Sequence, residues 1–205
     1  MAKGTLYIIS APSGAGKTTL VAELLRRHTD VVASISHTTR KQRDVEQDGV
    51  NYHFIGNDEF EEMMRNGDFL EHANVFGNYY GTSRQNIQEK LLRDKDVILE
   101  IDWQGARQIR DLEHGCKSIF VMPPSIEALR HRLESRDEDS DDIINLRMKE
   151  AVSEMSHYAE FDYLVINDDF EEAVAQLSTI FVSNRLLMEG QQQRHTKLLA
   201  SLLSD

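Results

Sequence analysis

A short run of glycine, lysine and hydroxyl side chains near the N-terminus has the composition of a phosphate-binding loop. The run is Ser10-Ala11-Pro12-Ser13-Gly14-Ala15-Gly16-Lys17-Thr18-Thr19, and it separates an apolar stretch from a stretch with helical spacing. Glycines let backbone N–H groups turn toward phosphate oxygens, and the start of the following helix adds its positive dipole end. Lys17 can reach the β- and γ-phosphates, and the Thr18 hydroxyl can ligate Mg²⁺. The sequence therefore predicts a nucleoside triphosphate site.

A basic segment lies at residues 34–43, in a chain that is otherwise acidic. It places Arg40 and Arg43 three residues apart, after several hydroxyl side chains. Guanidinium groups bind phosphate oxygens in a bidentate manner. If this segment lies across a cleft from the phosphate loop, it would hold a second phosphate group. The alternative is a solvated basic loop.

Acidic residues stand where two other chemistries need them. Glu100 and Asp102 close the apolar run Val97–Ile101, and an acid at the end of a strand beside a phosphate loop can hold Mg²⁺ and its waters. Glu71, within Phe69–Ala73, could accept two N–H donors from the edge of a guanine, which adenine does not present in the same arrangement. Taken singly, Glu71 is more simply interpreted as a surface residue.

The elements that must position these residues alternate between strands and helices, which is typical of an α/β fold with a parallel sheet and helices on both faces. Four apolar runs predict buried strands: Leu6–Ile9, Val97–Ile101, Ser118–Met122 and Tyr163–Ile166. Helical spacing follows each of them, at Lys17–His28, Trp103–Leu112, Ile126–Glu134 and from Phe170 onward.

Two interruptions break this alternation. Between about residues 34 and 90 short β-type pieces flank a helix at Asp58–Arg65, and Gly77–Gly81 is a hairpin signal. A polar stretch at 135–142 precedes a helix predicted at Ile143–Tyr158. We expect both insertions to cover the phosphate site. The C-terminal stretch is mostly helical with a weak point at 190–193, and it could pack on the core or on another subunit, which leaves a homo-oligomer open.

Length and composition limit the class of protein. With 205 residues and 40% hydrophobic residues, the chain fits one globular domain. Its net charge of −12 argues against nucleic-acid binding, which requires a basic face. No apolar run is long enough to span a membrane and no signal pattern is present. The single cysteine, Cys116, favours a reducing cytoplasm.

Taken together, these motifs resemble the guanylate kinase family of P-loop nucleoside monophosphate kinases. The matching pieces run in family order over about residues 4–185: Ala11–Thr19, Ser36–Arg43, Phe69–Ala73, Gly77–Thr82, Ile101–Gly105, Pro123–Ser125, Arg132–Arg136 and Ile166–Asp169. The resemblance implies one domain over 1–205, with a core made of 1–33, 84–134 and 159–205. It also implies an inserted, mixed α/β GMP-binding lobe at 34–83 and a short lid with its following helix at 135–158.

The implied activity is reversible, Mg²⁺-dependent phosphoryl transfer from ATP to GMP, giving ADP and GDP in purine nucleotide metabolism. The implied catalytic residues are Lys17, Arg40, Arg43, Arg136 and Arg147. ATP would be bound by Ala11, Pro12, Ser13, Gly14, Ala15, Gly16, Lys17, Thr18, Thr19, Arg132, Arg136 and Asn167. GMP would be bound by Ser36, Arg40, Arg43, Tyr52, Glu71, Tyr80, Thr82 and Asp102. Mg²⁺ would be held by Thr18, Glu100 and Asp102, partly through water.

The chain departs from the family pattern at five positions. Ala11 replaces the first glycine of the loop, and a negative φ there would preserve the loop. The others are Gln42 for proline, Val45 for glycine, Glu100 for aspartate and Asp137 for glycine. None of them removes a group assigned to the chemistry.

Three other functions fit the sequence less well. A scaffold module that recognises phosphopeptides typically lacks the intact ATP loop that is present here. A kinase for AMP or UMP would not need the trio of Ser36, Glu71 and Thr82. A regulatory GTPase would carry an Asn-Lys-x-Asp signature, which this sequence lacks.

Overall fold

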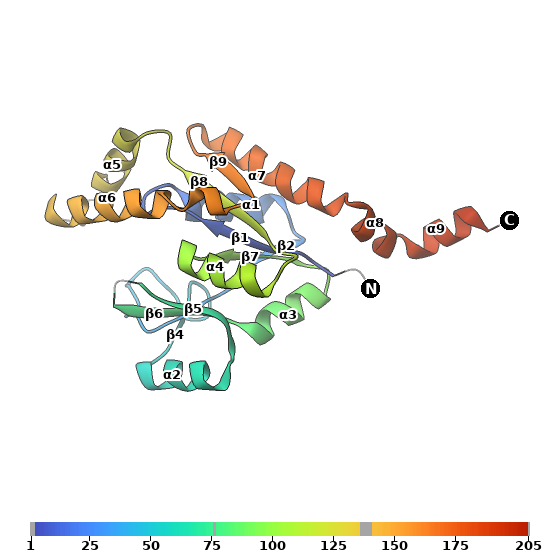
Figure 1. The fold of residues 1–205 in the computed structure, drawn as a ribbon, viewed down its shortest axis with the longest axis horizontal. Coiled ribbons are helices and arrows are strands. Elements are labelled where there is room, and N and C mark those ends of the chain that lie inside the picture. Colours follow the sequence, from blue (N-terminus) through green and yellow to red (C-terminus); the bar gives the residue numbers. More distant parts are fainter. Residues whose placement is uncertain (1–2, 76, 136–140, 205) are drawn as a thin grey trace.

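A five-stranded parallel sheet forms the centre of the computed structural model, which describes residues 3–75, 77–135 and 141–204 (Figure 1). In spatial order its strands are β2 (Val31–Ala33), β7 (Asp96–Glu100), β1 (Leu6–Ser10), β8 (Lys117–Met122) and β9 (Tyr163–Ile166). Every neighbouring pair is parallel. All the carboxyl ends therefore meet at one edge of the sheet, where ligands bind in open α/β folds.

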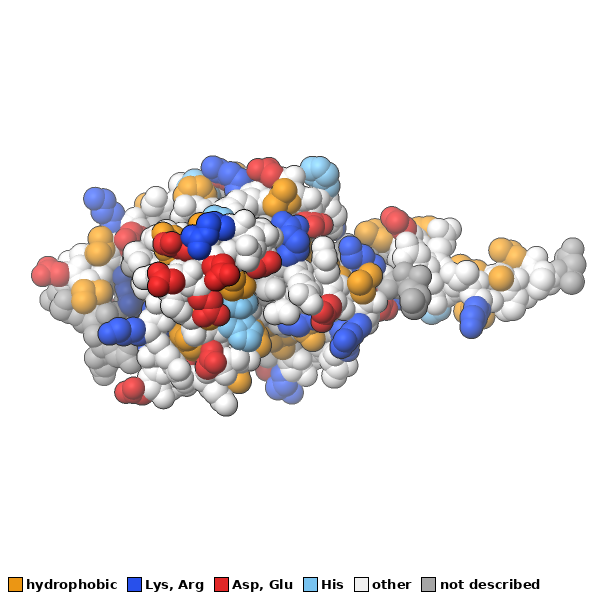
Figure 2. Space-filling view, turned by 90° about the horizontal axis from the view of Figure 1, so that it is seen from below, with side chains coloured by type: hydrophobic (Ala, Val, Ile, Leu, Met, Phe, Trp, Pro, Cys, Tyr) orange, Lys and Arg blue, Asp and Glu red, His pale blue; other side chains and the backbone are white. Residues whose placement is uncertain are grey.

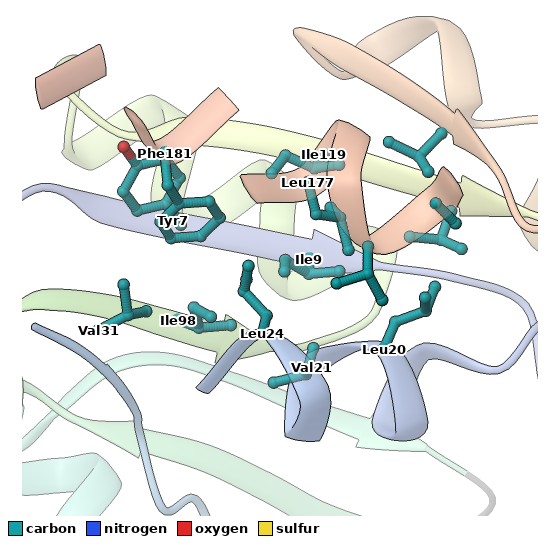
Figure 3. Packing of buried hydrophobic residues seen from close by; sticks show 14 residues of the cluster. Tyr7, Ile9, Leu20, Val21, Leu24, Val31, Ile98, Ile119, Leu177 and Phe181 are labelled. Carbon is teal, nitrogen blue, oxygen red and sulfur yellow. The ribbon is translucent and has the colours of Figure 1, made fainter. Parts of the chain in front are cut away.

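Helices cover both faces of this sheet, as predicted. Along β1 the side chains alternate between two hydrophobic clusters. Tyr7 and Ile9 pack with α1 (Lys17–Arg27) and α7 (Phe170–Arg185), as Figure 3 shows. Ile8 packs on the other face with α3 (Arg84–Leu92) and α4 (Trp103–Leu112). Burial on both faces explains why this strand is an unbroken apolar run in the sequence.

A second sheet has four strands and projects from the core beside α4. Its spatial order is β4 (His53–Phe54), β3 (His37–Thr38), β6 (Asn78–Ser83) and β5 (Phe69–Val75). Helix α2 (Asn57–Asn66) packs on it through Phe60, which stacks on Phe69 with ring centroids 4.5 Å apart. The predicted turn is shorter than expected: Gly77 has φ +76°, and β6 already begins at Asn78.

Two helices, α5 (Ile126–Glu134) and α6 (Asp141–Met155), pack on each other through a small apolar cluster of their own. The helix expected at Ile143–Tyr158 therefore ends three residues early, and a 3₁₀ turn, η1 (Tyr158–Glu160), follows. The reason lies in α4: the His157 ring stacks on Trp103 at 3.6 Å, and Arg107 and Arg110 donate to Glu160 at 2.7 and 2.8 Å. These contacts stabilise the chain after Met155 in a conformation other than a further turn of α6.

The C-terminal region leaves the body of the protein as a helical arm (Figure 1). After α7 it consists of α8 (Met188–Arg194) and α9 (Thr196–Leu203). The predicted weak point at 190–193 is wrong, because those residues lie inside α8. The break comes earlier because Gln191 and Arg194 both donate to the Arg185 carbonyl at the end of α7. Apolar side chains are exposed along the arm (Figure 2).

Three elements were missed by the sequence interpretation: β2, β3 and α3. The two strands have only three and two residues, which is too few for a recognisable alternation. Helix α3 buries only Ile87 and Leu91, so its apolar periodicity is weak. No helix in the described ranges has the length and apolar character needed to cross a membrane.

Candidate nucleotide-binding site

The phosphate loop joins β1 to α1 at the carboxyl edge of the parallel sheet. Gly16 has φ +88° and immediately precedes α1. A Cβ atom at Gly16 would also lie 2.5 Å from Asn167 Nδ2, so both backbone and packing require glycine. Within residues 3–75, 77–135 and 141–204, Asp94 is the one non-glycine residue with positive φ. Ala11 thus meets the condition expected of it.

The two acidic residues after β7 lie next to this loop. Parallel pairing aligns Ile9 of β1 with Glu100 of β7, so the loop and Glu100 leave the sheet side by side. Asp102 caps the N-terminus of α4: its Oδ1 accepts the Gly105 N–H at 2.9 Å. This helix cap fixes the Asp102 carboxylate at the sheet edge.

A buried carboxylate marks the opposite side, in the smaller sheet. Glu71 of β5 is 4% exposed, and Thr82 of β6 donates to its Oε1 at 2.5 Å. The hydroxyl of Ser36 lies 3.5 Å from that of Thr82. Burial, with a smaller contribution from Asp102, raises the pKa of Glu71 to about 7 although the Thr82 hydrogen bond lowers it. The three residues predicted to contact guanine thus form one connected group.

Arg40 is held in place by contacts on two sides. Its guanidinium donates to Glu46 Oε1 at 2.7 Å and to the Lys41 carbonyl at 2.8 Å. Its guanidinium carbon lies 5.4 Å from the Tyr52 ring centroid, within reach of a cation–π attraction. Glu46 also accepts the Arg43 N–H at 2.9 Å. One carboxylate therefore joins the Arg40 side chain to the Arg43 backbone, and its hydrogen bond to Arg40 lowers the pKa of Glu46.

A single cavity of about 580 Å³ connects the phosphate loop with this second group. Its walls come from the loop, the basic segment, the smaller sheet, the end of β7 and one face of α6. The predicted site residues that line it are Ala11, Pro12, Ser13, Gly14, Gly16, Lys17, Thr18, Thr19, Ser36, Arg40, Arg43, Tyr52, Glu71, Tyr80, Glu100, Asp102 and Arg147. The volume is in the range of small-molecule sites. The cavity is lined by Lys17 of the phosphate loop and by Arg40 and Arg43 of the basic segment. This arrangement suits two ligands that each carry phosphate.

Comparison with known proteins identifies the family. The model of the family described as guanylate kinase matches residues 3–184. This chain belongs to the guanylate kinase family. It is 58% identical over 200 residues to the guanylate kinase of Pseudomonas fluorescens strain Pf0-1, covering 98% of this chain and 97% of the relative. It is 53% identical over 207 residues to that of Escherichia coli strain K12, covering both chains completely.

A solved structure supports the same assignment. The crystal structure of guanylate kinase from Anaplasma phagocytophilum matches with a TM-score of 0.77 and 34% identity, covering 91% of this chain and 89% of that one. The predicted P-loop kinase architecture is thereby confirmed for this member of the guanylate kinase family.

Four of the predicted site residues that the structure describes do not line the cavity of this guanylate kinase family member, and a fifth, Arg136, lies outside the described residues. Thr82 donates to Glu71 from the side away from the cavity. The carbonyl of Ala15 accepts from Asn167 Nδ2 at 2.7 Å and from Arg132 Nη1 at 3.5 Å. Arg132 and Asn167 thus support the loop through Ala15, and a direct contact of either with ATP stays a prediction.

Two acidic residues of the cavity were missed by the sequence interpretation. Glu150 and Glu154 of α6 line it together with Arg147. Glu154 Oε2 accepts the Ser13 N–H of the phosphate loop at 3.2 Å. Burial raises the pKa of Glu154, against the opposite effects of the Ser13 hydrogen bond and Lys17. The available signal was the spacing 147, 150, 154, which places the three side chains on one helical face.

Proposed function

We propose that this cavity transfers the γ-phosphoryl group of ATP to GMP, giving ADP and GDP. The observation that carries the proposal is the union, in one cavity, of a phosphate loop with the buried Glu71 group. Membership of the guanylate kinase family supports the same reaction. An enzyme that only hydrolyses nucleoside triphosphates would not require the buried Glu71 carboxylate in the same cavity as Arg40 and Arg43.

At the donor end, the loop backbone and Lys17 would bind the β- and γ-phosphates. Arg147, which reaches the cavity from α6, would neutralise charge on the transferring group. Arg136, outside the described residues, is proposed for the same task. We also propose that Arg132 and Asn167 act near ATP, where their hydrogen bonds to the loop carbonyl keep the loop in shape.

At the acceptor end, Arg40 and Arg43 would hold the GMP phosphate with the hydroxyls of Tyr52 and Tyr80. All four line the cavity. In its ionised form Glu71 would accept two N–H groups of guanine. The hydroxyls of Ser36 and Thr82 and the carboxylate of Asp102 would complete the contacts with the base. Adenine lacks that pair of donors, so the arrangement would select GMP.

A divalent metal fits beside the loop. Thr18, Glu100 and Asp102 line the cavity with oxygen donors, the type that Mg²⁺ prefers. Within the described ranges no three histidine, cysteine or acidic side chains form a metal cluster on their own. We propose that these residues hold Mg²⁺ together with the phosphates of ATP, partly through water. When bound, it would neutralise charge on the β- and γ-phosphate oxygens.

The transfer itself requires alignment and charge neutralisation more than covalent help. We therefore propose no obligatory side-chain base. The residues named above would place the acceptor oxygen in line with the γ-phosphorus and exclude water, which limits wasteful hydrolysis of ATP.

We propose that two segments move during the reaction, with the boundaries predicted from the sequence. Residues 34–83 would act as the GMP-binding lobe and residues 135–158 as the lid with its following helix. The remaining segments would form the core. The proposed substrates and the single cysteine suit the cytoplasm expected from the sequence.

The test is ADP release from ATP in the presence of Mg²⁺, with GMP, AMP, CMP, UMP or no acceptor. Fast turnover with GMP alone is expected. Turnover with another monophosphate would keep the kinase and contradict the assignment of Glu71. Folded protein that binds ATP but phosphorylates none of these acceptors would contradict the proposed reaction.

A further inference from the structure

Helix α6 crosses the cavity with one face and packs on α5 with the other. Ile144, Met148 and Ala151 are buried against α5. Arg147 and Glu154 lie on the neighbouring face of the helix, where they line the cavity. They are seven residues apart, about 10 Å along a helix. A small change in the tilt of α6 would therefore shift Arg147 relative to the phosphate loop.

The C-terminal end of α6 is fixed to the core. Immediately after the helix, His157 stacks on Trp103 of α4 with ring planes only 7° apart. Glu160 then receives hydrogen bonds from two arginines of α4. These contacts hold the C-terminal end of α6, and the apolar cluster joins the helix to α5. Neither of them connects α6 to the phosphate loop.

Glu154 supplies the missing constraint. It lies between that fixed end and Arg147, and its Oε2 accepts the N–H of Ser13, a residue 141 positions away in the phosphate loop. A half-buried carboxylate next to a polyphosphate site is costly, since it would repel the phosphates. Glu150, one turn away, has a buried Oε2 without a hydrogen-bond partner among the described atoms. Of these two carboxylates, Glu154 is the one that joins α6 to the loop.

We propose that Glu154 is a positioning residue whose carboxylate ties α6 to the phosphate loop and so fixes where Arg147 meets the transferring phosphoryl group. This inference rests on the proposed function, because it assumes that Arg147 acts on the reaction. Its effect should appear in kcat rather than in the KM for GMP, since Glu154 touches the loop backbone and not the groups assigned to GMP.

The experiment compares Glu154→Ala with Glu154→Gln. The alanine variant loses the acceptor for Ser13, whereas the glutamine variant keeps an acceptor oxygen and loses only the charge. We expect Glu154→Ala to lower kcat by about 10- to 100-fold, the cost of a misplacement near 1 Å. The KM for GMP should change less than about three-fold, and Glu154→Gln should recover most of kcat.

Two further measurements separate a tether from a general structural role. Amide hydrogen exchange at Ser13 should become about ten-fold faster in Glu154→Ala and stay slow in Glu154→Gln. Glu150→Ala removes the same charge one turn away, and it should leave exchange at Ser13 unchanged. Val152→Ala, on the exposed side of α6, controls for helix propensity and should keep the wild-type kcat and melting temperature.

Each contrary result overturns the proposal. Equal loss of kcat in the alanine and glutamine variants would mean that charge matters and the tether does not. A wild-type kcat in Glu154→Ala would mean that the contact positions nothing. A wild-type chain that binds ATP and fails to phosphorylate GMP would instead overturn the proposed function, even if exchange at Ser13 responds as expected.

Discussion

At one end of the cavity, the phosphate loop offers backbone groups from a single stretch, residues 11–19, whereas at the other end Ser36, Glu71 and Thr82 come from three separate segments. The loop takes its shape from local features: two glycines with positive φ and the start of α1. The Glu71 group takes its shape from strand pairing in the smaller sheet, where β5 and β6 bring Glu71 opposite Thr82.

The difference separates affinity from selectivity. A loop of N–H groups with a lysine binds any triphosphate, because phosphate oxygens look the same in every nucleotide. A buried carboxylate is selective, because a ligand that cannot satisfy it leaves a desolvated acceptor unpaired. Changes in the loop should therefore remove activity with every acceptor, and changes around Glu71 should redistribute it among acceptors.

The largest effect is expected at the loop. Lys17→Ala should lower turnover by about a thousand-fold, the scale for loss of a group that stabilises charge in the transition state. The melting temperature should stay near that of the wild type, because Lys17 is not part of the apolar clusters. ADP release measured with GMP checks the prediction. Near-normal turnover would refute the phosphate-loop assignment.

Glu71→Gln should lower kcat/KM for GMP by about 100-fold, since one guanine donor would face the amide NH₂ instead of an oxygen. Binding of ATP, measured separately by calorimetry, should be unchanged. Glu59→Gln, an exposed acid on α2 of the same region, is the matched control. Unchanged preference for GMP in Glu71→Gln would place the base elsewhere in the cavity.

Gly105→Ala sharpens this comparison without altering any polar group. A Cβ atom there would lie 2.7 Å from Glu71 Oε2, so the carboxylate must move. The loss of kcat/KM should be in the same direction as that of Glu71→Gln and confined to GMP. An equal loss of ATP binding would show that α4 had shifted as a whole.

The same contrast explains which parts of the fold and of the candidate site could be predicted from the sequence. The loop, the four longer strands of the parallel sheet and Lys17 follow from residue types and local spacing. Residue chemistry raised a guanine contact for Glu71 as one possibility. Only the resemblance to guanylate kinases favoured it over a surface residue, because nothing in Phe69–Ala73 indicates that this acid is buried. Its 4% exposure depends on Thr82 and on the lack of a side chain at Gly105.

Glu154 illustrates what local patterns omit altogether. Its spacing on α6 identifies a helical face, but its partner is a backbone N–H 141 residues away. Such a contact leaves no trace in composition or periodicity. The early end of α6 was missed for a similar reason, since the stacking partner of His157 is Trp103 in a different helix.

The KM for GMP should depend on pH by about ten-fold, whereas the KM for ATP should not. Glu71 has a pKa raised to about 7, mainly by burial, and its ionised form is the one that accepts two N–H groups. The KM for GMP should therefore fall by about ten-fold as pH rises from 6 to 8, following the ionised fraction. The KM for ATP should follow no such curve.

Glu71→Gln is the control for this profile. In this variant the KM for GMP should lose the pH dependence that comes from the carboxylate. It should keep the dependence that comes from the GMP phosphate, whose second pKa lies near 6.

A raised pKa of Glu71 also means that the folded chain keeps the carboxyl proton to a higher pH than the unfolded chain does. The free energy of unfolding should thus fall as pH rises from about 4.5 to about 7, and a rise in this window attributable to Glu71 would contradict its burial.

The smallest effect is expected where an ion pair only supports the site. Glu46 binds Arg40 with side chains 12% and 18% exposed. Arg40 lines the cavity and Glu46 does not, so Glu46 acts on the ligand only through Arg40. Glu46→Gln should raise the KM for GMP about three-fold through looser placement of Arg40, with kcat and the KM for ATP unchanged. Glu61→Gln, which alters a 3.9 Å surface pair with Arg65, should change none of them. An increase in the KM for GMP in Glu46→Gln as large as that caused by loss of the Glu71 carboxylate would contradict this order. GMP binding would then depend mainly on the phosphate contacts, and selectivity for the base would have to come from residues other than Ser36, Glu71 and Thr82.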